Sequence, residues 1–208
     1  DYSMKIQFEE HLPYAALAVI VLILFYGIYF AKMLLQKRRG IATRQIGRKK
    51  DKSIRTTELL MGIATLGAPA AQIASILFGW NYMPADARFT GFCIGIIGDF
   101  IFLLSVICMK DSWRAGIPDN EKTELITTGI YKYSRNPAFL GFDFMYIGVM
   151  LIYLNPLTVI FSLFAVVTLH LQILQEEKYL TAAFGSEYLE YKSRVFRYLG
   201  NTKRSSGK

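Results

Sequence analysis

A short polar block, Arg135-Asn136-Pro137, stands directly before an apolar segment and has the residue types of a helix start. Proline suits the first helical turn because its missing N–H is not needed there, and asparagine is a good N-cap residue. The free N–H groups at such a start can bind a carboxylate or a phosphate, and Arg135 adds a positive charge. Helical spacing places Asn136 and Asp143 on one face. We therefore expect an anion-binding helix start, with a carboxylate further along the same face.

A second polar group ends the next apolar segment, where His170, Ile173 and Glu177 share one helical face. Glu176 and Glu177 are adjacent, and two carboxylates at a helix C-terminus oppose the helix dipole. The candidates for a compensating positive charge are a cationic ligand and Arg135, Arg194 or Arg197. Two plainer interpretations stay open: a solvated pair of glutamates, and a core His170 bonded to a backbone carbonyl.

The elements that carry these groups have the composition of membrane helices. The chain has 208 residues, of which 53% are hydrophobic and only 19% charged, and its mean hydropathy is +0.30. A membrane-crossing helix needs about 20 mostly apolar residues. We therefore predict a single all-α, polytopic membrane domain over residues 1–208, with the first apolar run a span rather than a cleaved signal peptide. The five expected spans are residues 14–35, 59–80, 90–109, 137–154 and 156–175.

The last apolar run, residues 137–175, is too long for one crossing. As a single helix it would measure roughly 58 Å, whereas the hydrocarbon core is about 30 Å thick. Asn155-Pro156 lies in its middle and is a turn signal. We therefore predict a helical hairpin, whose open end brings Arg135 and Asn136 close to Glu176 and Glu177.

The distribution of Lys and Arg predicts the orientation. The formal net charge is +8; nine Lys or Arg lie in residues 36–57, five in the loop after the third span and seven after residue 175, against only Lys5 and Arg88 on the other side. The positive-inside rule then places the N-terminus outside and the C-terminus in the cytoplasm, in a membrane that we expect to be a prokaryotic cytoplasmic membrane. We attribute the basic loops to topology and lipid headgroups, and we expect no nucleic-acid partner.

Two further features complete the pattern. Cys93 and Cys108 have no metal-ligand spacing, so we expect no metal site and no disulfide framework. After residue 186, aromatic and basic residues alternate, which is typical of a helix in the headgroup region; folding back over a pocket mouth is the alternative. We predict a C-terminal interfacial helix.

Three ordered blocks carry a resemblance to a known family: TELITTGIY at 123–131, SRNPAFLG at 134–141 and EEKYLTAAFGSEYLEY at 176–191. Together they resemble the isoprenylcysteine carboxyl methyltransferase and phospholipid methyltransferase superfamily of integral membrane enzymes. The resemblance covers residues 113–197, the expected cofactor-binding half. It implies a methyltransferase that binds S-adenosylmethionine on the cytosolic side and acts on a membrane lipid or another lipophilic acceptor.

The resemblance also implies roles for individual residues. Glu124, Leu125 and Ile126 would line the cofactor through their backbone, and Tyr131 would pack on it. Its amino-acid and sulfonium end would be held by Asn136, Pro137, Ala138 and Phe139. Arg135 would face the cofactor carboxylate, and Glu177 its ammonium or hydroxyl groups.

The chain departs from the family pattern at three positions. Asn136 replaces the family histidine and Phe139 the family tyrosine, while Ile173 stands where prenylcysteine enzymes carry an arginine that faces the substrate carboxylate. These departures weaken the prenylcysteine assignment and direct attention to His170 and Asp143. We list His170, Asp143 and Arg135 as catalytic candidates and expect an amine, hydroxyl or thiol acceptor.

Two other functions remain open at this stage. Membrane reductases of the sterol reductase type have a similar architecture and use NADPH, but Glu176 and Glu177 are poor partners for its phosphates. A non-enzymatic scaffold or transporter would not need two polar blocks to converge at one end of a hairpin.

Overall fold

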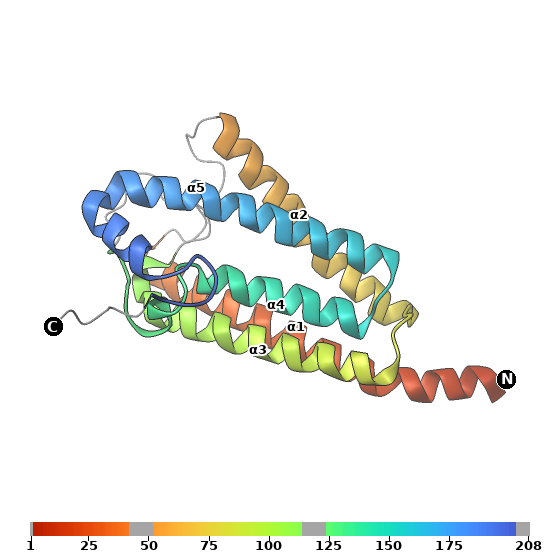
Figure 1. Cartoon of the computed structure of the whole chain (residues 1–208). Coiled ribbons are helices and arrows are strands. Elements are labelled where there is room, and N and C mark those ends of the chain that lie inside the picture. Colours follow the sequence, from red (N-terminus) through yellow and green to blue (C-terminus); the bar gives the residue numbers. More distant parts are fainter. Residues whose placement is uncertain (1, 42–51, 114–123, 203–208) are drawn as a thin grey trace.

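The chain forms a bundle of helices in a computed structural model that describes residues 2–41, 52–113 and 124–202, with side chains from residue 11 onward (Figure 1). Within these residues an isolated β-bridge between Val195 and Asn201 is the only extended pairing. The helices are α1 (Tyr2–Arg38), α2 (Lys52–Phe78), α3 (Ala85–Met109), α4 (Pro137–Ile152) and α5 (Pro156–Arg194), with short 3-10 turns η1 (Lys110–Ser112) and η2 (Gly129–Lys132). The all-α prediction is confirmed.

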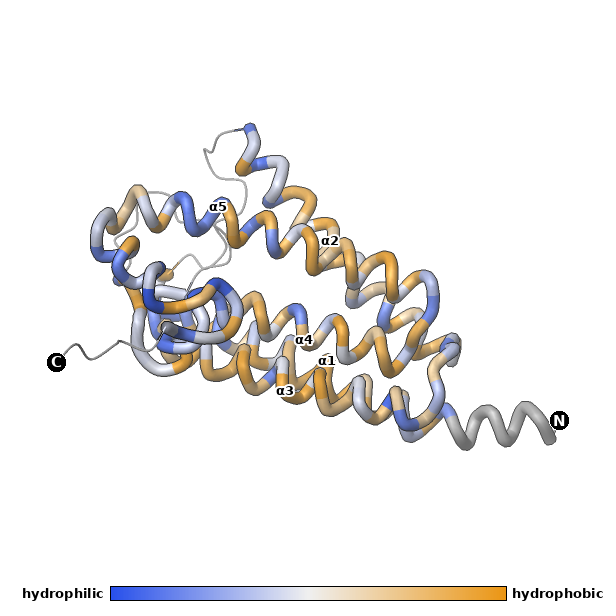
Figure 2. The backbone as a smooth tube through the Cα atoms, in the orientation of Figure 1, coloured by the Kyte–Doolittle hydropathy of each residue, from blue (hydrophilic) through white to orange (hydrophobic). Residues whose placement is uncertain are grey.

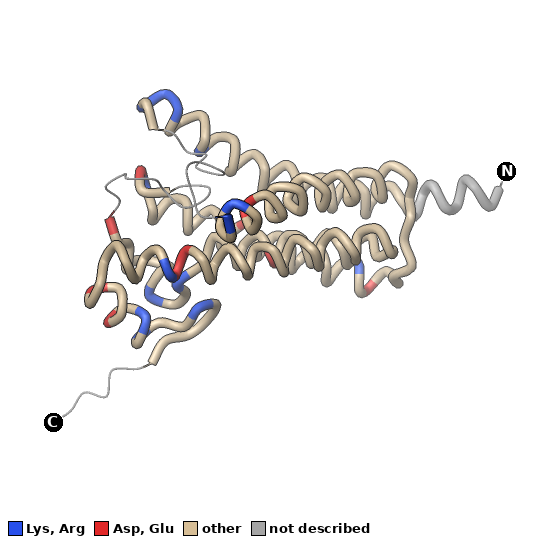
Figure 3. Tube along the Cα trace, turned by 90° about the horizontal axis from the view of Figure 1, so that it is seen from above, with Lys and Arg blue, Asp and Glu red and all other residues tan. Residues whose placement is uncertain are grey.

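Four helical segments of the described chain are long and apolar enough to cross a membrane. They are His11–Arg38, Lys52–Phe78, Ala85–Ser112 and Pro156–Arg194. The fifth apolar helix, α4, has 16 residues. Hydrophobic residues extend along the length of the bundle (Figure 2), and charged residues collect mostly at the end where α5 finishes (Figure 3). These features identify an integral membrane protein.

Glycines bring α3 and α4 into backbone contact. A Cβ added to Gly98 would lie 2.7 Å from the Met145 nitrogen, and one added to Gly148 would lie 2.5 Å from the Gly95 nitrogen. Side chains at these positions would therefore force the two helices apart. Small residues at a helix interface allow this close approach inside membranes. The seam fixes the start of α4 beside the end of α3.

Aromatic packing holds α1 against the same pair of helices. The Phe25 ring stacks on Phe102 at 4.5 Å, and Trp113 meets Phe102 edge to face at 6.2 Å. The Gln36 side chain donates a hydrogen bond of 2.9 Å to the Trp113 carbonyl. These contacts position the residues that follow α3.

Local chemistry fixes the junction between α4 and α5. Asn155 caps α5 by accepting a hydrogen bond from the Thr158 N–H, and Thr158 returns the bond in a capping box. The Asn155 Nδ2 also donates to Ser75 Oγ at 2.9 Å and to the Trp80 carbonyl at 2.8 Å. Helix α4 ends at Ile152, two residues before its predicted end, because the chain needs a short turn before Pro156.

The chain turns back on itself after α5. Gly185 takes a positive φ of 54° and bends the last turns of α5. Residues 195–202, which we call the C-terminal strap, then run back over the segment before α4 (Figure 1). The Arg135 N–H donates to the Phe196 carbonyl at 3.0 Å, and the Gly200 N–H donates to the Tyr133 carbonyl at 2.7 Å.

Candidate functional site

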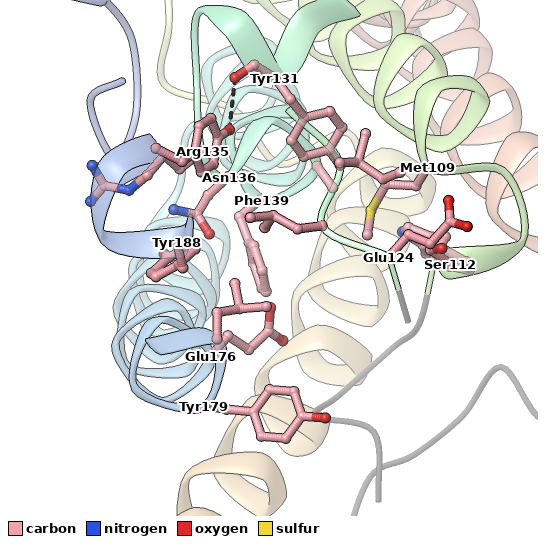
Figure 4. A pocket seen from close by; sticks show the side chains of 16 residues that line it. Met109, Ser112, Glu124, Tyr131, Arg135, Asn136, Phe139, Glu176, Tyr179 and Tyr188 are labelled. Carbon is pink, nitrogen blue, oxygen red and sulfur yellow. Dashed lines mark hydrogen bonds between the residues drawn. The ribbon is translucent and has the colours of Figure 1, made fainter. Parts of the chain in front are cut away.

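A cavity opens at the strap end of the bundle, between the end of α3, residues 124–131, the start of α4 and the distal part of α5 (Figure 4). The empty space in it is about 870 Å³ when the open mouth is included. The lining residues are Met109, Ser112, Trp113, Glu124, Leu125, Ile126, Tyr131, Arg135, Asn136, Ala138, Phe139, Glu176, Tyr179, Leu180, Tyr188 and Tyr191.

The structure brings most of the sequence-predicted site residues together in this cavity. The predicted residues that line it are Glu124, Leu125, Ile126, Tyr131, Arg135, Asn136, Ala138 and Phe139. Four predicted residues do not line it: Pro137, Asp143, His170 and Glu177. Pro137 is the first residue of α4, as its type predicts.

The cavity also contains residues that the sequence analysis did not select. Tyr188 and Tyr191 belong to the third motif block, so the block itself was a signal for them. Met109 and Trp113 carried no such signal, because only the packing of α3 against α1 and α4 brings them to the wall. Glu176 was noted as a partner of Glu177, and in the structure it is Glu176 that reaches the cavity (Figure 4).

Glu177 instead lies at the centre of a buried ion network. Its Oε1 accepts a hydrogen bond from Arg135 Nη2 at 2.7 Å and its Oε2 one from Arg197 Nη2 at 2.9 Å. The Lys192 ammonium is 3.8 Å away, and the side chains of Arg135 and Glu177 are 7% and 5% exposed. Burial alone would raise the pKa of Glu177, but the hydrogen bonds from Arg197 and Arg135 outweigh it and lower this pKa to about 2.

Asn136 connects this network to the cavity. Its side chain makes no N-cap bond to α4, in contrast to the prediction from its type. The Nδ2 donates to Glu177 Oε1 at 3.4 Å and to the Arg197 carbonyl at 3.2 Å instead. The hydrogen bonds of Asn136 thus go to Glu177 of α5 and to the strap instead of to the start of α4.

One tyrosine of α5 fixes the loop across the cavity. The Tyr191 hydroxyl donates to the Tyr131 carbonyl at 2.7 Å, as the dashed line in Figure 4 marks. Burial raises the pKa of Tyr131 well above its ordinary value and that of Tyr188 to about 12. These phenols are therefore neutral at physiological pH and form an uncharged aromatic wall.

His170 and Asp143 lie outside the cavity and meet the strap. His170 Nδ1 is hydrogen-bonded to the Tyr198 hydroxyl, and the two rings stack at 6.0 Å. The partner of His170 is thus a tyrosine and not the backbone carbonyl considered above. Asp143 is 8% exposed, and its Oδ1 has no hydrogen-bond partner among the described residues. Burial raises the pKa of Tyr198, and the nearby Asp143 raises it further.

The cavity therefore combines three kinds of group. Glu124 and Glu176 bring carboxylates, Arg135 and Asn136 bring nitrogen donors, and the tyrosines with Phe139 bring flat apolar surface. The carboxylates and the aromatic surface suit a small molecule that carries a cationic part and an aromatic ring. Fold and site together define an integral membrane protein with a small-molecule site at one end of its bundle.

Comparison with known proteins narrows this class. The phospholipid methyltransferase family model matches residues 88–187. Protein-S-isoprenylcysteine O-methyltransferase of Saccharomyces cerevisiae is 43% identical over 122 residues, which are 57% of this chain and 51% of the yeast protein. Protein-S-isoprenylcysteine O-methyltransferase B of Arabidopsis thaliana is 27% identical over 67% of this chain and 84% of its own length.

These matches confirm the predicted resemblance to the isoprenylcysteine and phospholipid methyltransferase superfamily. The match spans about half of the yeast protein's length. Both relatives are eukaryotic, so they lend no support to the expectation of a prokaryotic membrane.

Proposed function

We propose that this protein is a membrane-embedded methyltransferase that takes a methyl group from S-adenosylmethionine and transfers it to a lipophilic acceptor. The observation that carries the proposal is the convergence of residues from three separate motif blocks on one cavity. The fold brings three residues that are separated in the sequence to one cavity wall: Glu124, Asn136 and Tyr188. The two relatives are named as O-methyltransferases, which agrees with this chemistry.

The cavity lining fits the methyl donor. Glu176 and Glu124 offer carboxylates to an ammonium or to hydroxyl groups, whereas the side-chain donors of Arg135 and Asn136 are bonded to Glu177 and the strap. Tyr131 and Tyr188 offer neutral flat surface to an aromatic base. When bound, S-adenosylmethionine supplies an electrophilic methyl group, and the protein contributes alignment and exclusion of water.

Glu177 supports this site from outside it. Its carboxylate holds the guanidinium of Arg135, which lines the cavity, and that of Arg197 in the strap. We therefore assign Glu177 a positioning role in place of direct contact with the cofactor. The NADPH alternative fits less well, because Glu124 and Glu176 would repel its phosphates while Arg135 is already paired.

Calorimetry on the detergent-purified protein tests the proposal directly. We expect adenosylhomocysteine to bind and NADPH not to bind under the same conditions. Glu176→Gln should weaken adenosylhomocysteine binding, whereas Glu187→Gln, at an exposed position of the same helix, should not. Binding of NADPH alone would support the reductase alternative and refute the proposal.

We also propose that the chain crosses the membrane five times. The helices run in alternating directions, so that α1 begins at one end of the bundle and α5 finishes at the other (Figure 1). A hairpin of α4 and α5 then needs α4 to cross together with its short flanking turns. With the basic loops in the cytoplasm, labels at Met83 and Gly116 should report opposite sides of the membrane. Labelling of both from the same side would contradict five spans.

For the acceptor, we propose a neutral nucleophile rather than a prenylcysteine carboxylate. Ile173 is fully buried and offers no charge. His170 is bonded to Tyr198 of the strap, and Asp143 acts electrostatically on the same tyrosine. The neighbouring strap residue, Arg197, belongs to the ion network. His170 could take up the proton that a neutral nucleophile releases on methylation. Methyl-transfer assays with farnesylcysteine and with amine-bearing lipids compare the two acceptors. Robust methylation of the farnesylcysteine carboxylate would refute this part.

A further inference from the structure

The C-terminal strap has one face turned to the site and another turned outward. Arg197 and Tyr198 point inward, to Glu177 and His170. Phe196 and Leu199 point outward and are 51% and 60% exposed. The two middle residues of this stretch thus face the bundle, while the two residues that flank them present large apolar side chains outward, which indicates a partner.

Tyr133 extends the outer apolar face. It is 58% exposed, and its carbonyl accepts a hydrogen bond of 2.7 Å from the Gly200 N–H. Gly200 has a φ of +118°, and a Cβ there would lie 2.7 Å from the Phe196 ring. The Phe196 ring therefore packs against the backbone at Gly200, which is itself bonded to Tyr133. We call Tyr133, Phe196 and Leu199 the strap patch.

The depth of the strap indicates what covers this patch. Tyr198 is bonded to His170, which lies five residues before residue 175, where the fifth span predicted from the sequence ends. At the helical rise this is roughly 7.5 Å inside that end. Interfacial segments bury their apolar face about 5–10 Å into the boundary between headgroups and acyl chains. The strap patch is thus at the depth where lipid covers apolar side chains.

The charges around the strap patch select the kind of lipid. Lys132 adjoins Tyr133 in sequence, and the side chains of Lys192 and Arg194 are 41% and 48% exposed. Arg194 pairs with Glu190 at 3.4 Å, but both side chains are exposed, so that this pair is weak. Basic side chains at the membrane surface attract anionic headgroups, each by about fivefold in binding.

We propose that the strap patch and these basic residues bind the anionic headgroup layer of the membrane, and that this contact keeps the cofactor site assembled. Lipid on the outer face holds the strap against the bundle. Arg197 then stays on Glu177, and Glu177 keeps Arg135 at the cavity wall. The second half of this inference rests on the proposed function, whereas the lipid contact does not.

An environment-sensitive fluorophore tests the lipid contact by itself. The label is attached to Leu199→Cys, with Glu187→Cys as the control, after Cys93→Ser and Cys108→Ser remove the native thiols. In nanodiscs that contain equal amounts of phosphatidylglycerol and phosphatidylcholine, the label at 199 should emit as in an apolar medium and the label at 187 as in water. A label at 199 that emits as in water would overturn the proposal.

Adenosylhomocysteine affinity tests the coupling to the site. We expect tighter binding in the anionic nanodiscs than in pure phosphatidylcholine, by about fivefold for each basic residue engaged. Lys132→Gln with Arg194→Gln should remove most of the difference, and Phe196→Ser with Leu199→Ser should weaken binding in the anionic nanodiscs to the level in phosphatidylcholine. Equal affinity in both membranes would overturn the coupling. Absence of binding everywhere would refute the proposed function, while the fluorophore would still decide the lipid contact.

Discussion

Replacing Glu177 by glutamine removes a carboxylate of α5 that binds both the strap and the segment before α4. The wild-type carboxylate accepts hydrogen bonds of 2.7 Å from Arg135 and 2.9 Å from Arg197, and the side chains of Arg135 and Glu177 are almost fully buried. Glutamine keeps the shape but leaves the guanidinium of Arg135 as a buried charge without a counter-charge. Removing one partner of a buried pair typically costs about 3–5 kcal/mol.

This cost is measurable as a loss of thermal stability. For a chain of this size, 1 kcal/mol shifts the melting temperature by about 2–4 °C, so that Glu177→Gln should lower it by roughly 6–20 °C. Glu187→Gln removes the same charge from an exposed position of α5 and should change it little. The assay is thermal unfolding of the purified protein in detergent, followed by tryptophan fluorescence.

Glu176→Gln separates the two adjacent glutamates. Glu176 lines the cavity, so that its replacement should weaken adenosylhomocysteine binding more than it lowers the melting temperature. Glu177→Gln should do both, because Arg135 loses its position. A Glu177→Gln protein that melts like the wild type and binds adenosylhomocysteine equally well would refute the positioning role.

Three further predictions concern pH, catalysis and packing. The pKa of Glu177 falls from its ordinary 4.5 to about 2 on folding, so its ion pairs should stabilise the protein fully above pH 4.5 and lose this effect between pH 4.5 and 2. Melting temperatures measured across this range should fall accordingly, and Glu177→Gln should remove this part of the pH dependence. His170→Ala should lower turnover more than adenosylhomocysteine affinity, and an equal loss of both would indicate a structural role. Gly148→Ala, whose new Cβ would lie 2.5 Å from the Gly95 nitrogen, should destabilise the protein by about 1–3 kcal/mol, whereas Gly62→Ala, with open space around it, should not destabilise it.

Local sequence chemistry was enough to predict much of the fold. Pro137 begins α4 and the chain turns at Asn155-Pro156, as predicted, because these preferences depend only on neighbouring backbone groups. The apolar runs predicted membrane helices because the length and hydropathy of a run are also local properties of the sequence. The end of α4 and the side chain of Asn136 were predicted less well, since tertiary partners in the turn and in the strap decided them.

The candidate site was predictable where its residues belong to the three motif blocks. The contribution of Met109 and Trp113 could not be foreseen, because it depends on how α3 ends against α1. Tyr198 escaped notice for a different reason: its bond to His170 requires the strap to fold back, and no local pattern distinguishes that course from a helix in the headgroup layer.

The pair Glu176 and Glu177 shows where periodicity stops being informative. Helical spacing placed Glu177 on the face of His170, and both residues indeed meet the strap. Adjacent residues of a helix point about 100° apart, so Glu176 and Glu177 face different neighbours. Spacing alone could not tell which face of α5 borders the cavity, because that depends on the elements packed around the helix. The strap supplies Arg197 on one side, and residues 124–126 with the end of α3 form the cavity on the other. Glu177 thus holds the site together, whereas Glu176 faces the bound molecule. This is why we expect the two glutamine variants to differ.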